Sequence, residues 1–275
     1  MSKLSFLFAA LVIAVGVAGL VGCGDGSSGD TLANIKKAGV LKWGADAEGG
    51  GPFVFRDEKD TNKIIGFEMD MMEKIAGHMG VKAERQQAEW EKLIPALLSK
   101  RSDLVMNGFE INEERKKVAA FSQPYYSYEQ QLTVRVDDKD KIKSLADLAG
   151  KKVGTLANAE ANNVLKEKGF KDDQILTSPD STLPYKNLSD KRVDAVLQES
   201  IIASFYAGDA SKYHNIPETF GAGLYGIVVR PDDKALLAEA DRILALMKEN
   251  GELAAIYKKW SIWNDKQAAL GIKVK

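Results

Sequence analysis

The sequence predicts an α/β fold in which strands alternate with helices in two successive units. Short apolar runs at 104–106, 151–156 and 193–200 read as strands, and each is followed by a polar turn and a helical pattern. Strands that alternate with helices in this way form parallel βαβ units. The 275 residues, 45% of them hydrophobic, can supply the cores of two domains or of one large unit.

The charges of the chain nearly cancel, with 38 basic and 39 acidic side chains. A balance of this kind argues against a general nucleic-acid surface, so we expect no nucleic-acid partner. The two histidines are isolated: His78 lies on the expected helix that carries Met72 and Met79, and His214 lies in a polar loop. They suggest neither a metal site nor a catalytic triad, and we expect no cofactor.

The N-terminus is similar to a lipoprotein signal peptide. Lys3 precedes an apolar run that ends in LVGC, where Cys23 is the only cysteine. We expect residues 1–22 to be removed, Cys23 to carry lipid, and residues 23–32 to form a flexible tether at a membrane surface. An uncleaved membrane anchor and a buried helix are the alternatives, and the Gly/Ser linker after the cysteine disfavours both.

The first unit begins with a helix that Thr31 can cap and Gly39 ends, followed by a strand at 40–46. Three glycines at 49–51 let backbone amides approach a ligand, although they are equally typical of a flexible loop. The next helix carries a stripe of core residues, Met72, Ile75 and Met79. A strand is expected at 81–88.

A second helical stripe follows this strand. It comprises Trp90, Leu93, Ile94, Leu97 and Leu98. The four aliphatic residues are ordinary core candidates. Trp90 lies at the junction of strand and helix, where its side chain can face a ligand crevice or cap the core.

The polar stretch 107–126 begins where a buried strand ends, the usual mouth of a ligand crevice in an α/β sheet. Arg115 lies within it and is placed to bind an anion. The alternative is that the run is a solvated helix face. We assign Lys116 and Lys117 to such a face.

The remaining segments continue the alternation. Residues 128–138 predict a long strand, and the charged run after it predicts an exit from the first unit. Two amphipathic helices broken near Gly251 follow a strand at 223–233. The first of them carries an apolar stripe that we assign to the core of the first unit: Leu236, Leu237, Ala240, Ile243, Leu244 and Met247.

Several motifs occur in a characteristic order: GFEMDMMEKIAG, WEKLIPALLSKRSDLVMNG, EERKKVAAFSQPYY, GKKVGTL, RVDAVLQES, YGIVVR and IYKKW. Over residues 33–262 the chain resembles the family 3 extracytoplasmic solute-binding proteins, polar amino-acid receptors of ABC importers. The resemblance implies two Rossmann-like lobes joined by two hinge strands, the type II periplasmic binding protein-like fold. Lobe 1 would comprise 33–133 and 224–265, lobe 2 134–223, and 266–275 a C-terminal tail.

The resemblance also implies functional residues and partners. Arg115 holds the ligand α-carboxylate, a role that suits the two parallel hydrogen bonds of a guanidinium. Glu199 receives the α-ammonium, where the family usually has aspartate. Trp90 packs on the ligand, and Asp46 contacts a distal polar group. We expect a monomer that binds an amino acid, engages an ABC permease, and lies in the periplasm or on the outer cell surface, anchored to the membrane by lipid.

The chain departs from the family pattern around this site. Glu110 stands where many relatives have a small hydroxyl residue, and Asn158, Ala159 and Glu160 replace a Gly-Thr-Thr loop. Because a carboxylate repels a ligand anion, Glu110 must point aside, pair with Arg115, or meet a cationic group. The ligand-binding positions therefore give an acidic site around Trp90 that favours a basic or strongly polar amino acid: Asp46, Glu48, Gly108, Glu110, Arg115, Asn158, Ala159, Glu160 and Glu199.

Two other functions remain open from the sequence. Some relatives of these receptors are dehydratases, and Glu110 or Glu160 could serve as the general acid or base of such an enzyme. A lipoprotein that reports on a ligand without transporting it is the third reading. We expect a receptor without catalytic activity.

Overall fold

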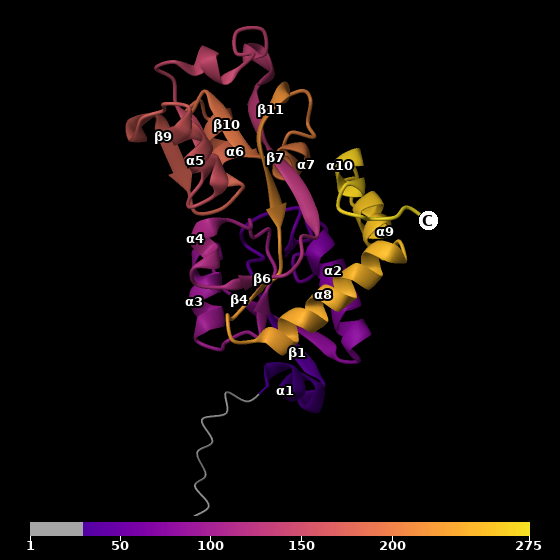
Figure 1. Ribbon diagram of the computed structural model, residues 1–275. Coiled ribbons are helices and arrows are strands. Elements are labelled where there is room, and N and C mark those ends of the chain that lie inside the picture. The colour runs from indigo at the N-terminus through magenta and orange to yellow at the C-terminus, as the bar shows by residue number, and fades with distance from the viewer. Residues whose placement is uncertain (1–29) are drawn as a thin grey trace, which may run out of the picture.

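The computed structural model describes residues 30–275. It contains two five-stranded sheets flanked by helices, with strand order β4-β1-β5-β12-β6 in the first and β11-β7-β10-β8-β9 in the second (Figure 1). The predicted α/β fold of two similar units is confirmed. We refer to the elements of the first sheet with their helices as lobe 1, and to those of the second as lobe 2.

Lobe 1 is formed by segments from both ends of the chain. Its elements are α1 (Thr31–Ala38), β1 (Val40–Ala45), β2 (Phe55–Arg56), β3 (Ile64–Ile65), α2 (Phe67–Met79), β4 (Lys82–Gln87), η1 (Trp90–Lys92), α3 (Leu93–Leu98), β5 (Leu104–Val105), α4 (Glu113–Lys116), β6 (Ala120–Phe121), β12 (Val228–Val229), α8 (Lys234–Glu249) and α9 (Glu252–Lys259). The short α10 (Asp265–Ala268) follows near the C-terminus.

Lobe 2 is continuous in sequence. Its elements are β7 (Tyr126–Arg135), η2 (Val136–Asp138), η3 (Leu145–Leu148), β8 (Val153–Leu156), α5 (Glu160–Glu167), η4 (Asp172–Gln174), β9 (Ile175–Ser178), α6 (Leu183–Ser189), β10 (Ala195–Glu199), α7 (Ser200–Tyr206) and β11 (Tyr213–Tyr225).

Parallel pairing brings the carboxyl ends of β1 and β5 to one edge of the lobe 1 sheet. In this register Gly44 lies beside Val105. The residues that follow the two strands are therefore neighbours, and the backbone N–H of Asp46 donates to Oδ1 of Asn107 at 2.9 Å. This edge faces lobe 2.

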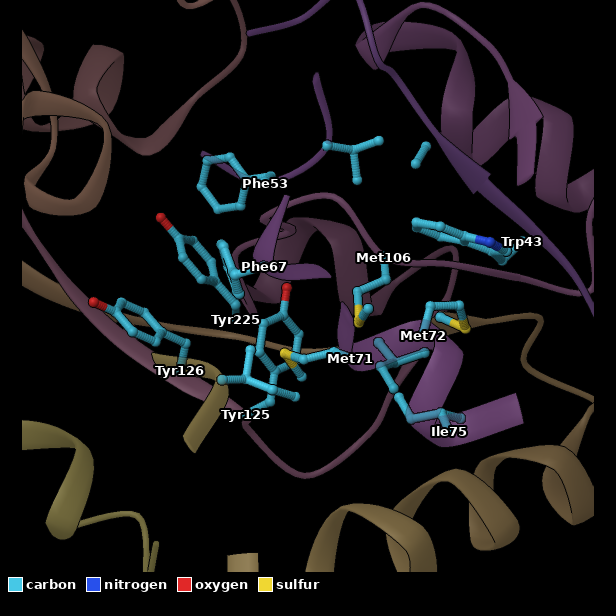
Figure 2. Close-up of a cluster of buried hydrophobic side chains, with 14 of the residues drawn as sticks. Trp43, Phe53, Phe67, Met71, Met72, Ile75, Met106, Tyr125, Tyr126 and Tyr225 are labelled. Carbon is cyan, nitrogen blue, oxygen red and sulfur yellow. The ribbon is translucent and has the colours of Figure 1, made fainter. Parts of the chain in front are cut away.

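The core of lobe 1 is built largely on α2. Figure 2 shows Met71, Met72 and Ile75 of this helix gathered with Trp43 and Met106. The predicted core stripe of α2 is confirmed. The stripe of α8 joins the same core, as predicted, with only Leu237 partly exposed.

Two details of the N-terminal half differ from prediction. Asp30 caps α1 by accepting from the N–H of Leu32 at 3.1 Å, so Thr31 is the first helical residue and the expected tether cannot extend to residue 32. Leu98 is exposed, not core, because the segment begins as a 3₁₀ turn and its α-helical part ends at this residue. The expected signal peptide and Cys23 lie outside the described residues.

Lobe 2 is joined to lobe 1 through a pair of long antiparallel strands, β7 and β11 (Figure 1). Sequence reasoning found only the last residues of β11, within the strand expected at 223–233, and placed His214 in a polar loop, whereas this residue pairs with Val134 in β11. The strand contains Pro217 and two register shifts, which remove the alternating pattern by which strands are recognised. The lobe boundaries at 133/134 and 223/224 fall within these strands and stay a prediction.

The start of the C-terminal segment 266–275 packs against β7. The side chain of Gln267 is buried, accepts from the N–H of Ser127 at 2.9 Å and donates to its carbonyl at 2.8 Å. Gln267 is thus attached to a strand that connects the lobes, whereas the N–H of Lys273 donates to the carbonyl of Lys248 in α8 at 3.0 Å. Across residues 30–275, no helix combines the length and the apolar character needed to cross a membrane.

Candidate functional site

A small cavity lies between the lobes, at the edge where the strands of both sheets end. Its volume is about 30 Å³, room for about two water molecules. Lobe 1 lines it with Gly49, Gly50, Phe53, Trp90, Asn107, Gly108 and Glu110, and lobe 2 with Leu156, Pro179, Asp180, Ser181, Glu199 and Ile202. The lining includes three carboxylates and, among the described residues, no lysine, arginine or histidine.

Glu199 ends β10 and directs a buried carboxylate into this cavity. Its side chain is 3% exposed, and Oε2 has no hydrogen-bond partner among the described residues. Burial raises the pKa of this carboxyl group well above its ordinary value, and the nearby charge of Glu110 raises it further. The site therefore favours a positive charge next to Glu199.

Glu110 is paired with Arg115, one of the three outcomes expected for it. The Glu110 carboxylate is 2% exposed and forms an ion pair with the Arg115 guanidinium. Its other oxygen accepts from the backbone N–H of Glu160, the first residue of α5, at 3.1 Å. A carboxylate of lobe 1 is thereby held between a cation of its own lobe and an amide of lobe 2.

Arg115 is positioned by its own short helix and by two rings. Asn112 caps α4 by accepting from the N–H of Arg115 at 2.9 Å. The guanidinium carbon lies 5.2 Å from the ring centres of both Trp90 and Phe109, which stack on each other. These contacts leave Arg115 facing an outer groove.

The outer groove has a volume of about 470 Å³ and lies at the mouth of the cleft. Arg115, Asn158, Ala159 and Glu160 line it but do not line the inner cavity, whereas Trp90 lines both. The structure therefore divides the predicted site residues between two spaces.

The lobes are in direct contact around the cavity. The N–H of Ser181 donates to the carbonyl of Gly49 at 2.9 Å, and the N–H of Gly51 donates to the hydroxyl of Tyr206 at 3.0 Å. Arg115 also donates to the carbonyl of Asn158 at 3.1 Å. These bonds hold a closed arrangement of the two lobes.

Asp46 and Glu48 lie away from both spaces. The Asp46 carboxylate accepts from the N–H of Glu48, from the side chain of Gln87 at 2.7 Å, and from the N–H of Trp90 at 3.0 Å. Asp46 thus orients the start of η1 instead of facing the cavity. The side chain of Glu48 is 58% exposed and pairs with Arg56. Neither residue lines the inner cavity or the outer groove, and the ligand contacts expected of them stay a prediction.

The sequence reasoning missed Asp180 and Ser181. They follow β9, and Asp180 accepts from the N–H groups of Thr182 and Leu183, both at 2.8 Å, at the start of α6. A signal was present, since these polar residues lie just beyond the end of a parallel strand. Their position opposite Gly49 depends on lobe closure, which no local pattern reports.

A buried carboxylate also supports Gly108. The N–H of Gly108 and the hydroxyl of Tyr125 donate to the same oxygen of Glu68, at 2.9 and 2.5 Å. Burial raises the pKa of Glu68 to about 7, although these hydrogen bonds oppose the shift. Gly108 has φ of +64°, and a Cβ there would lie 2.7 Å from the ring of Phe53, so glycine is required.

Residues 41–262 match the family model of the bacterial extracellular solute-binding proteins, family 3. The L-cystine-binding protein TcyJ of Escherichia coli K12 is 30% identical over 230 residues, which cover 83% of this chain and 85% of that protein. The ABC transporter arginine-binding protein 1 of the same organism is 31% identical over 210 residues, covering 73% and 83%.

Solved structures agree with these relatives. The ancestral amino acid-binding protein AncCDT-1, a precursor of cyclohexadienyl dehydratase, gives a TM-score of 0.77 at 33% identity and covers 84% of this chain and 99% of that chain. An ancestral arginine-binding protein bound to arginine gives a TM-score of 0.73 at 36% identity and covers 81% and 98%. The predicted type II periplasmic binding protein-like fold is confirmed.

Proposed function

The chain belongs to the bacterial extracellular solute-binding proteins, family 3, and from this premise we propose that it is a receptor that captures a basic or strongly polar amino acid for an ABC importer. The ligand enters between lobe 1 and lobe 2, and bending of β7 and β11 closes the lobes around it. The relatives named for binding cystine and arginine support the amino-acid class.

The acidic lining of the inner cavity carries this proposal. Glu110, Asp180 and Glu199 line it together, and among the described residues only Glu110 pairs with a cation there, Arg115. Because the buried carboxylate of Glu199 is costly unless a cation meets it, a ligand with a positive group is favoured. The ring of Trp90 can add a cation–π contact worth about 0.5 to 2 kcal/mol.

We further propose that the mature protein is a monomer anchored by lipid on Cys23 outside the cytoplasmic membrane, where it meets the permease of an importer. The basis is the LVGC sequence and the Gly/Ser linker after it. Labelling cells with a fatty-acid analogue tests the anchor. Wild type should take up the label and Cys23→Ala should not; an unlabelled wild type would remove the anchor from the proposal.

A thermal-shift screen of purified residues 24–275 against amino acids and their amidated and decarboxylated derivatives tests the receptor function. A ligand at 100 times its Kd raises the free energy of unfolding by about 2.7 kcal/mol. We expect arginine, lysine, histidine or their derivatives to stabilise the protein more than glutamate. Tighter binding of glutamate than of every cationic compound would overturn the cationic class, and a flat response across the panel would overturn the receptor proposal.

We infer binding without catalysis, because the relatives described above are named for binding. Recovery of the ligand unchanged and in stoichiometric amount checks this inference. Turnover would instead support a dehydratase-like enzyme.

A further inference from the structure

We propose that Glu110 supplies, from within the chain, the carboxylate that Arg115 and the start of α5 hold, so that the ligand is a small organic cation without a free carboxylate. Amines and amino acids with an amidated carboxyl group belong to this class. The inference rests on the proposed function: it keeps the capture of a cationic ligand between the lobes, and it replaces the free amino acid by a related cation without a carboxylate.

Glu110 occupies the position that the family resemblance implies for a ligand carboxylate, between Arg115 and the start of α5. A guanidinium and a backbone N–H group each form strong, charge-assisted hydrogen bonds with a carboxylate. Here both donors are engaged, since Arg115 pairs with one oxygen of Glu110 and the N–H of Glu160 donates to the other at 3.1 Å. This carboxylate bridges the two lobes as a bound ligand would.

The backbone fixes the direction of Glu110. The residue forms an isolated antiparallel bridge with Tyr225 at the end of β11. On either side of it, the N–H of Ile111 donates to the carbonyl of Leu224 at 2.8 Å, and the N–H of Gly226 donates to the carbonyl of Phe109 at 3.1 Å. Glu110 therefore sits on hydrogen-bonded backbone, and its side chain enters the cleft as part of the fold.

The rest of the inner cavity suits a cation and not an anion. A second carboxylate placed there would face Glu110, Asp180 and Glu199, and the described residues that line the cavity include no lysine, arginine or histidine to compensate it. A ligand ammonium or guanidinium would instead reach the unpartnered oxygen of Glu199. The site thus keeps Glu199 to bind the cationic group of a ligand, and the carboxylate of Glu110 takes the place of the ligand's own carboxylate.

Two matched ligand series test this inference by calorimetry. Arginine is compared with argininamide and agmatine, and lysine with lysinamide and cadaverine, so that each series differs in the carboxyl group. We expect wild type to bind a carboxylate-free member about tenfold or more tighter than its parent amino acid, which corresponds to about 1.4 kcal/mol. In Glu110→Ser the freed Arg115 should accept a ligand carboxylate, and the order should reverse.

Two further variants keep the test decisive. Glu110→Gln retains the size of the side chain but removes its charge, so it should also lose the preference for carboxylate-free ligands. It takes the place of Glu110→Ser in the test if that variant does not fold. Glu113→Ser removes an exposed carboxylate of the same run and should leave the wild-type order unchanged.

The outcomes separate this inference from the proposed function. If wild type binds arginine or lysine tighter than every carboxylate-free partner, the ligand displaces Glu110; the inference is then overturned while the receptor function stands. If neither series binds to wild type or to either Glu110 variant, the cationic ligand class fails, and the inference fails with it.

Discussion

The carboxylate of Glu110 and the guanidinium of Arg115 form an ion pair in which the two side chains are 2% and 13% exposed. Removing one partner of a buried pair leaves an uncompensated charge, which typically costs 3 to 5 kcal/mol. Because Arg115 borders the outer groove, we expect Arg115→Ala to lower the free energy of unfolding by about 3 kcal/mol in urea titrations.

The double variant Arg115→Ala/Glu110→Gln provides the control for this prediction. It removes the stranded charge and should recover most of the lost stability. If Arg115→Ala is as stable as wild type, the pair does not form in solution.

Binding of a cation should release a proton from the site. Burial and the charge of Glu110 raise the pKa of Glu199, so this carboxyl group retains a proton at pH values where an ordinary glutamate has lost it. A ligand cation favours the ionised form and lowers that pKa. Affinity should therefore increase with pH below the raised pKa, and calorimetry in buffers of different ionisation enthalpy should detect the released proton.

Glu199→Gln is the matched variant for the proton release. It has no proton to lose and should bind more weakly, with an enthalpy that is the same in every buffer. An equally buffer-independent enthalpy in wild type would contradict the prediction.

Glu68 should make the protein less stable as pH rises toward neutrality. Its pKa is about 7 in the folded chain, compared with 4.5 for an ordinary glutamate. Between these values the folded state binds more protons than the unfolded state, so the free energy of unfolding falls as pH increases and levels off above pH 7. The difference in pKa corresponds to about 3 kcal/mol.

Glu68→Gln should remove this dependence, because glutamine retains an acceptor for Gly108 and Tyr125 without ionising. Denaturant titrations from pH 4.5 to 8 measure the effect. Glu73→Gln, which changes an exposed residue of α2, should follow the wild-type curve. Parallel curves for wild type and Glu68→Gln would show that Glu68 does not cause the dependence.

Gly50 should be needed for closure of the lobes. It has φ of +98°, and a Cβ there would lie 2.1 Å from the hydroxyl of Tyr206 in lobe 2. We expect Gly50→Ala to weaken ligand binding by about tenfold or more and to prevent the ligand-induced compaction measured by small-angle scattering. Gly208→Ala, whose Cβ would meet only ordinary contacts, should behave as wild type.

Features with strong local signals could be predicted from the sequence. The helical spacing of the apolar residues in α8 and of the methionines in α2 predicts that they are buried. The stretch around Arg115 follows a recognisable strand. Features that depend on distant partners could not. Nothing near Asp46 indicates that Gln87 and Trp90 saturate its carboxylate.

The pairing of Glu110 could be predicted only in part from the sequence. Three outcomes were open from the sequence because Arg115 lies five residues away, within reach but not at a diagnostic spacing. The deciding contact, with the N–H of Glu160, comes from lobe 2 and exists only when the lobes meet.

The order of strands along the chain has a consequence for synthesis. All five strands of the lobe 2 sheet lie within residues 126–225, whereas the lobe 1 sheet needs β12, which sits between β5 and β6 and follows all of lobe 2 in the chain. We expect lobe 2 to complete its sheet first, at a stage when β5 and β6 still lack β12, the strand that pairs with both of them. Until residues 228–229 arrive, lobe 1 exposes unpaired strand edges, the part of this protein most open to misassembly.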